Sequence, residues 1–497
     1  MQKPASLETP VEPGEAPPQV IFHPPTPLSW RLGILTGIAA IGLLAYFARD
    51  VIGLRGQAFA GIVFFFGIVA AFSSNLRAVN WRTVFWGVVL QLLLAVLVLK
   101  VPFVYHGFEG LGKVVKHFIE FSNAGAKFVF GNLYDARPAD QGGTWSRLFP
   151  TDYAFQFAFV ALPPILFVSA FFTVLYHFGI LQWCVRALAL VMVHLMGTSG
   201  AETLSVAANV FMGQTEAPLI VRPYVPRMTN SELFALMASG MAHISGALMV
   251  VYISYGADPV AVLTTCVMAC PCSLYLSKLF LPEVSKPVTG GTVHTGKEKS
   301  PYVNAIDAAA TGTSDGLQLA LNVAAMLIVF IAFVAMFDFL LAGIKPGLLG
   351  LGISADNLAF WPDNLSLKTM FGWLFSPVAF LMGVAKEDAA TVGTLLGTKL
   401  SMNEHVAYLD MRRLLAVTDP TTGDLIKAAQ MSDRSFKLTA FALTGFANFS
   451  SVGIQLGGIG AMAPGRRHDL ARLGLRALFV GFTASLLNAA MAGLLSP

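Results

Sequence analysis

The sequence predicts an all-α polytopic membrane protein with about nine transmembrane helices, two re-entrant helical hairpins and two discontinuous helices. Three observations lead to this fold class. Of the 497 residues, 55% are hydrophobic and only 12% are charged, whereas a soluble domain carries about 25% charged residues. Nine apolar stretches have about the length that crosses a bilayer, roughly 20 residues. Two further apolar stretches are interrupted by acidic and amide side chains.

Residues 1–29 form a tail rich in Pro and Glu, which cannot bury a core and is expected to be disordered. The tail has neither a positively charged start nor a small-residue cleavage site, so we expect no cleaved signal peptide. Residues 180–196 are apolar with one Arg and are expected to lie along the cytoplasmic interface. The predicted spans are 31–48, 57–74, 82–100, 154–176, 232–254, 258–281, 317–342, 436–463 and 472–494.

The arginines in short loops favour a cytoplasmic N-terminus, because cytoplasmic loops carry an excess of Lys and Arg. Residues 101–153 and 343–371 would then be external. Four arginines oppose this bias, because they would lie outside: Arg49, Arg55, Arg412 and Arg413. The arginines that support it are Arg77, Arg82, Arg222, Arg227, Arg466, Arg467 and Arg472.

The two interrupted stretches are 200–221, with "GQTEAP" at its centre, and 372–410, with "GVAKEDAATVG" and Glu404. Each is followed by a span with Gly, Ser and polar residues at mid-length, "ASGMAHISG" and "TGFANFSSVGIQLGG". Gly costs about 1 kcal/mol relative to Ala inside a helix, so we expect both spans to be unwound there. Paired hairpins and broken helices are typical of a transporter's central binding site. The alternative is that the small residues only allow tight helix packing.

Glu216 and Glu404 support a functional site at these interruptions. A carboxylate at the bilayer centre costs at least about 2.5–3.5 kcal/mol, so it usually faces the bundle interior and has a function. The side chains around them suit a neutral, multiply hydroxylated ligand with a heterocyclic ring. No Gly-rich loop with Lys or Arg offers a phosphate site. The surrounding polar residues are Gln214, Thr215, Asn403, Asn448, Ser450 and Ser451.

Other chemical classes have little support. Three of the four cysteines lie in "CVMACPCSLYL", whose spacing is unlike a zinc site, and we expect them to pack within a helix. The net charge of +4 is spread over the loops and does not indicate a nucleic-acid partner. A membrane-embedded hydrolase could use the two glutamates with His243 or His405, but the sequence has no HExxH and no GxSxG in a strand–turn–helix context.

At these residues the sequence resembles the concentrative nucleoside transporter family, over roughly residues 57–494. The resemblance rests on four blocks in the right order. They are "ANVFMGQTEAPLIVRPYVPRMTNSELFALM", "NAIDAAATGTSDGLQLALNVAAMLI", "SPVAFLMGVAKEDAATVGTLLGTKLSMNEHVAYLDM" and "LTGFANFSSVGIQLGGIG".

The resemblance implies an eight-helix core with re-entrant hairpins at about 199–221 and 372–410, and with span 31–48 as an extra N-terminal helix. It also implies a homotrimer whose protomers each have a scaffold part and a transport part that moves like an elevator. The expected organisation is a tail (1–29), the N-terminal helix (30–55), scaffold helices (56–176), a first transport half (177–316), a scaffold helix (317–342) and a second transport half (343–497).

The resemblance further implies cation-coupled uptake of nucleosides such as uridine, cytidine and adenosine across the inner membrane of a bacterium, without a cofactor or nucleic-acid partner. "GQTE" resembles the less selective members, which implies a broad substrate range. The base-reading group would be Gln214, Thr215 and Glu216. The ribose-binding group would be Glu404, Asn448 and Ser451, with Phe446 and Leu248 as apolar neighbours. A receptor that binds nucleosides without transport is a further alternative.

The coupling ion is where the sequence departs from the family. In sodium-coupled members the ion sits between the first hairpin tip and the next unwound helix, where Asn209, Met212 and Ile244 match the ligand positions. His243 holds the position of a hydroxyl ligand. Sodium prefers oxygen ligands, as calcium does, whereas a histidine in a span can carry a proton. Both ions therefore stay open, and His243 favours the proton.

Overall fold

A computed structural model describes residues 25–134, 159, 162–290, 302–354, 357, 365–415, 417–418 and 425–496. Within these ranges, seven helices are long and apolar enough to cross a membrane, and nine if each of two bent pairs counts as one span. The all-α fold with about nine spans is therefore confirmed. Residues 1–24 of the expected disordered tail and most of the segment 133–153 lie outside the described residues. The tail was expected to extend to residue 29, but helix α1 already begins at Leu28.

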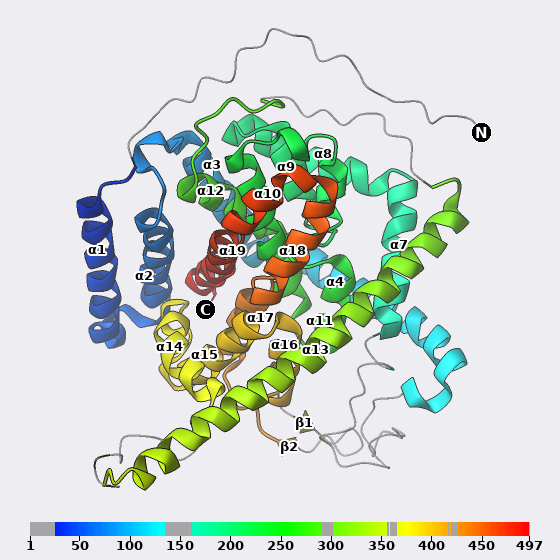
Figure 1. Ribbon diagram of the computed structural model, residues 1–497. Coiled ribbons are helices and arrows are strands. Elements are labelled where there is room, and N and C mark those ends of the chain that lie inside the picture. Colours follow the sequence, from blue (N-terminus) through cyan, green and yellow to red (C-terminus); the bar gives the residue numbers. More distant parts are fainter. Residues whose placement is uncertain are drawn as a thin grey trace.

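Helices α1 and α2 lie side by side at one edge of the molecule, and α7 lies at the opposite edge (Figure 1). The spans α1 (Leu28–Phe47), α2 (Arg49–Ala71) and α3 (Trp81–Lys100) are followed by the long helix α4 (Pro102–Phe130). Short 3-10 helices are η1 (Leu76–Ala78) and η2 (Gly131–Tyr134). Next come α7 (Leu162–His177) and α8 (Ile180–Met196), which meet at a bend of 75°.

The first hairpin starts with α9 (Gly200–Ala208), turns at 209–216 and returns through η5 (Ala217–Val221) and η6 (Val225–Arg227). The first broken helix is α10 (Asn230–Ala242) and α11 (Gly246–Ser254). Ser199 and Thr229 each form a capping box at the start of α9 and α10, which satisfies backbone donors at the helix ends. α12 (Pro259–Phe280) follows and contains the three closely spaced cysteines.

α13 (Ala305–Gly350) is a single helix of 46 residues and crosses the view in Figure 1 diagonally. Its length of about 70 Å far exceeds a bilayer core of about 30 Å. The expected scaffold helix at 317–342 was too short, and the expected boundary after residue 316 falls inside α13. A Cβ at Gly312 would lie 2.8 Å from Ala170 Cα, so glycine permits the close packing of α13 on α7.

The second hairpin differs in its limits from the expected 372–410. α14 (Leu367–Leu381) and α15 (Lys386–Ser401) meet at 119°, and the chain then reverses at 402–403 into α16 (Glu404–Arg413). The second broken helix is α17 (Asp433–Leu443) and α18 (Phe449–Met462), followed by η8 (Pro464–Arg466) and α19 (Arg467–Leu495).

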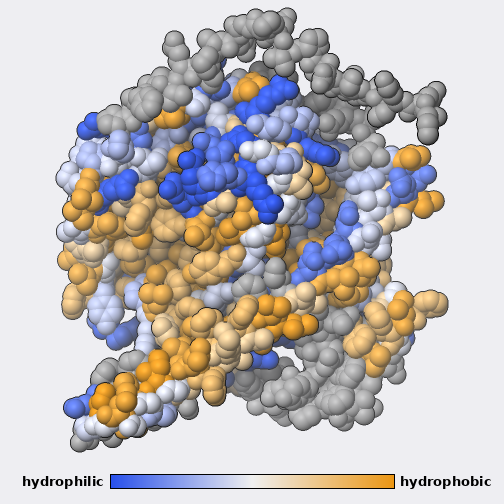
Figure 2. Space-filling model, in the orientation of Figure 1, coloured by the Kyte–Doolittle hydropathy of each residue, from blue (hydrophilic) through white to orange (hydrophobic). Residues whose placement is uncertain are grey.

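The short antiparallel pair β1 (Val417–Thr418) and β2 (Leu425–Lys427) was not expected from the sequence. It lies between α16 and α17, outside the helical core. α10, α12 and α19 pack at the centre of the molecule (Figure 1). Figure 2 shows apolar side chains over much of the middle of the visible face, with hydrophilic ones gathered towards one end. An apolar belt of this kind suits a lipid environment.

Candidate functional site

The breaks in the two discontinuous helices lie against each other. Phe446 N donates to His243 O at 3.0 Å, and Gly246 N donates to Phe211 O in the first hairpin, also at 3.0 Å. Gly445 has a φ of 136°, and a Cβ there would lie 3.0 Å from Ala242 O. Only glycine suits both the backbone conformation and the close approach. The unwound segments of both halves and the first hairpin therefore meet at one place.

Glu404 of the second hairpin accepts hydrogen bonds on both of its carboxylate oxygens. Tyr252 OH donates to Glu404 Oε1 at 2.8 Å, and Asn448 Nδ2 donates to Glu404 Oε2 at 2.9 Å. Asn403 caps α16, since its side chain accepts from Val406 N at 3.0 Å. Glu404 is consequently the first residue of α16, where the helix dipole favours a carboxylate.

Asn448 and Ser451 are positioned by the start of α18. Asn448 Oδ1 accepts from Ser451 N at 2.9 Å and from Ser450 Oγ at 2.6 Å. Gln214 Nε2, in the first hairpin, donates to Ser451 Oγ at 3.1 Å. The expected ribose-binding residues and one expected base-reading residue thus form a single buried hydrogen-bond chain.

The other expected binding residues lie nearby in different surroundings. Thr215 packs on Gly458 of α18, where a Cβ would lie 2.7 Å from Thr215 Cγ2. Phe446 and Leu248 are both buried, one in the second break and one in the first turn of α11. Buried oxygens of Gln214 (Oε1) and Glu216 (Oε2) have no hydrogen-bond partner among the described residues, which leaves acceptors for a ligand.

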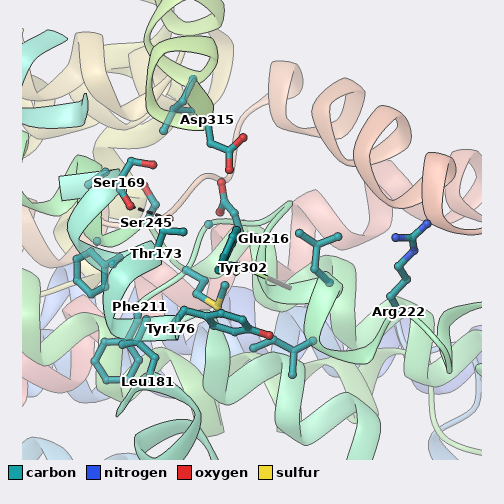
Figure 3. Close-up of a pocket in the computed structure, with 18 of the residues that line it drawn as sticks. Ser169, Thr173, Tyr176, Leu181, Phe211, Glu216, Arg222, Ser245, Tyr302 and Asp315 are labelled. Carbon is teal, nitrogen blue, oxygen red and sulfur yellow. Dashed lines mark hydrogen bonds between the residues drawn. The ribbon is translucent and has the colours of Figure 1, made fainter. Parts of the chain in front are cut away.

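Glu216 belongs to a cavity of about 550 Å³ that the expected ribose-binding residues do not line. Its walls come from α7, α8, the first hairpin, residues 245–247, Tyr302 and α13. In Figure 3 the carboxylates of Glu216 and Asp315 point towards each other. The structure therefore separates the expected site into a closed hydrogen-bond chain and an open cavity.

Two of the expected cation residues, Asn209 and Met212, lie in the first hairpin, and the other two, His243 and Ile244, lie in the break between α10 and α11. Asn209 Nδ2 donates to Ser239 Oγ at 3.1 Å, while the buried Asn209 Oδ1 has no partner among the described residues. His243 Nδ1 lies 2.8 Å from Ser239 O, and His243 Nε2 lies 3.4 Å from Cys270 Sγ. Met212 lines the cavity and Ile244 is buried in the first break.

Sequence reasoning missed several functional candidates. Asp315 lies in "GTSDG", two residues before the predicted span 317–342, and a carboxylate so close to an apolar span was a signal that could have identified it. Tyr252 gave no such signal, because its partner Glu404 is 152 positions away. Lys399 is fully buried, and its ammonium donates to Ala442 O at 2.8 Å and Ser485 Oγ at 3.0 Å. It ties the second hairpin to α17 and α19.

Profiles of known families match most of the chain. "Na+ dependent nucleoside transporter C-terminus" matches residues 261–493, "Na+ dependent nucleoside transporter N-terminus" matches 60–133, and "Nucleoside recognition" matches 158–259.

Similar proteins cover almost the whole chain. Sodium/nucleoside cotransporter 1 of Homo sapiens is 40% identical over 479 residues, which span 95% of this chain and 69% of that protein. An uncharacterized transporter of Haemophilus influenzae is 38% identical over 435 residues, or 87% and 96% of the two chains.

Solved structures of CNTnw are similar in fold. An inward-facing, substrate-bound state has a TM-score of 0.78 at 35% identity and covers 89% of this chain and 98% of that one. A doubly substituted CNTnw in an outward-facing state has a TM-score of 0.79 at 34% identity, covering 89% and 99%.

Proposed function

The chain belongs to the concentrative nucleoside transporter family, and we propose that it takes up nucleosides by secondary active transport coupled to a cation. It is a multi-pass membrane protein and a transporter, not an enzyme. The observation that best supports nucleosides as its substrates is the buried hydrogen-bond chain from Glu404 through Asn448 and Ser451 to Gln214. This chain connects both hairpins with a broken helix, as a ligand held between them would.

In this proposal Glu404, Asn448 and Ser451 hold the ribose. A carboxylate has about four acceptor positions, and protein donors use one on each oxygen of Glu404. Vicinal hydroxyls can therefore donate to the remaining positions, in charge-assisted bonds. Gln214, Thr215 and Glu216 would read the base, for which the unpartnered oxygens of Gln214 and Glu216 supply acceptors.

The substrate range is proposed to be broad for pyrimidine and purine ribonucleosides and closed to nucleotides. A nucleotide would bring its ribose-linked phosphate close to the Glu404 carboxylate, and like charges repel strongly in a low dielectric. Competition of radiolabelled uridine uptake by adenosine, thymidine, uracil and UMP tests this. Inhibition by adenosine is expected, with weaker inhibition by thymidine because it lacks the 2′-hydroxyl. Strong inhibition by UMP without any by adenosine would contradict the proposal.

Movement is proposed to follow the elevator mechanism within a homotrimer in the inner membrane of a bacterium. The cavity supports the division into two parts, because scaffold helices α7 and α13 form one wall and the first hairpin forms the other. The scaffold then includes all of α13. Exposed apolar side chains along α13, such as Ile328 and Phe339, would face lipid or another protomer. Mass measurement of the protein in nanodiscs tests the trimer, and a monomeric mass would exclude it.

The coupling ion is proposed to be a proton that binds His243. Because a carbonyl oxygen only accepts, His243 Nδ1 donates to Ser239 O, and Nε2 faces Cys270 Sγ. The Ser239 oxygen and the Cys270 sulfur can each accept a hydrogen bond from an imidazolium, so the protonated ring would keep two partners. The unpartnered Asn209 Oδ1 supports the alternative, a sodium ion.

Uridine uptake into proteoliposomes, with a sodium gradient or a pH gradient imposed separately, distinguishes the two ions. Uptake that follows the pH gradient is expected, and His243→Ser should then uncouple it from pH. Uptake driven by sodium alone and indifferent to pH would show that His243 is not the proton carrier.

A further inference from the structure

We propose that Tyr252 of α11 is a positioning residue that fixes the Glu404 carboxylate for recognition of the ribose hydroxyls. The inference rests on the proposed nucleoside transport. Tyr252 is fully buried, and its OH donates to Glu404 Oε1 at 2.8 Å. Glu404 begins α16 in the second hairpin, so this bond joins the first broken helix to the second hairpin.

Tyr252 complements the contact that Asn448 makes with the other carboxylate oxygen. Asn448 cannot turn to serve both oxygens, because its Oδ1 already accepts from Ser450 and Ser451. Without the Tyr252 hydroxyl, Glu404 Oε1 would lose the donor that sets its direction. The carboxylate would then rotate about its terminal bond, which has a broad torsional preference.

The ring of Tyr252 is itself held in place. It stacks on Tyr408 with ring centroids 4.5 Å apart and planes at 19°. Tyr408 OH lies 2.9 Å from Ala440 O and 2.8 Å from Thr444 Oγ1 on the α17 side. Tyr408 therefore anchors the stack to the second broken helix, while Tyr252 directs its hydroxyl at the site. The two tyrosines have similar packing and different hydrogen-bond partners.

This difference provides a matched pair of variants. Tyr252→Phe keeps the ring stack and removes only the donor to Glu404. Tyr408→Phe keeps the same stack and removes a hydroxyl that does not contact Glu404. A packing role predicts similar effects from the two variants, whereas a positioning role predicts that only Tyr252→Phe changes the recognition of ribose hydroxyls.

The test measures KM for uridine and for 2′,3′-dideoxyuridine in proteoliposomes, together with direct binding of both ligands to the purified protein by calorimetry. Tyr252→Phe should raise KM and Kd for uridine about tenfold or more, since hydrogen bonds to charged groups are among the strong ones. The dideoxy compound, which lacks both hydroxyls, should change by less than about twofold on the same reasoning. Tyr408→Phe should leave the ratio of the two ligands' KM values, and of their Kd values, unchanged.

An equal change for both ligands, or no change for either, would overturn the positioning role of Tyr252. A lower maximal rate, with an unchanged ratio between the KM values for uridine and the dideoxy compound, would also overturn it. Calorimetry measures the Kd of purified protein, so the test remains valid if less Tyr252→Phe protein is reconstituted into proteoliposomes. Absence of uridine uptake and binding in the wild-type protein would instead refute the proposed function, so the two failures are distinguishable.

Discussion

Replacement of Glu404 by Gln removes one buried negative charge while keeping the size of the side chain. The surroundings determine how the amide must lie. Asn448 Nδ2 and Tyr252 OH are the two donors to the carboxylate. Asn448 Nδ2 cannot accept, so the Gln oxygen must face Asn448 and the Gln NH2 must face Tyr252. A tyrosine hydroxyl can accept a hydrogen bond, so the variant should fold and reach the membrane.

The effect on transport follows from what the substrate then meets. A ribose hydroxyl that would donate to the Tyr252 side of the carboxylate meets an N–H donor instead. Each hydrogen bond to a charged group contributes about 1.5–3 kcal/mol, or about 10- to 150-fold in affinity. The hydroxyl on the Asn448 side still meets an oxygen, but a neutral one, so Glu404→Gln should lower the transport efficiency for uridine by at least about tenfold.

The assay is initial-rate uptake of radiolabelled uridine in proteoliposomes containing equal amounts of folded protein. Glu387→Gln is the matched control, because Glu387 is an exposed residue in the first turn of α15, within the same hairpin. The control should transport at the wild-type rate. Near-normal uridine uptake by Glu404→Gln would refute the assignment of this carboxylate to the ribose.

Two further predictions concern the framework of the site. Gly445→Ala should destabilise the second break by about 1–3 kcal/mol, because alanine is strained at a φ of 136° and its Cβ would lie 3.0 Å from Ala242 O; a melting temperature equal to that of the wild type would contradict this. Lys278→Met should cost about 3–5 kcal/mol, because it leaves the buried Glu202, 2.6 Å from the Lys278 ammonium, without its ion pair. Denaturation in detergent should show this loss, and restoration by the double variant with Glu202→Gln is expected.

The membrane fold could be predicted because apolar length and intramembrane polar residues are local properties of the sequence. Glu404, Asn448 and Ser451 were identifiable for this reason, and the structure brings them together. The full length of α13 was not predicted, because its first turns carry Asp307 and Asp315 and lack the apolar character of a span.

The cavity beside Glu216 could not be predicted, because it depends on how α7 and α13 pack against the first hairpin. The role of Tyr252 was equally hidden, since a tyrosine in an apolar helix is ordinarily a core residue. The sequence indicated His243 as unusual, but its contact with Cys270 comes from the packing of α10 on α12. Contacts between segments that are far apart in the sequence could be identified only from the folded structure.

The most direct measurement of the central claim is uphill accumulation of radiolabelled uridine in proteoliposomes containing only this protein. With an inwardly directed cation gradient, the account predicts an internal uridine concentration that rises above the external one. It should fall back to the external level when an ionophore collapses the gradient. Uridine that binds without ever exceeding the external concentration under any imposed sodium or proton gradient would contradict secondary active transport.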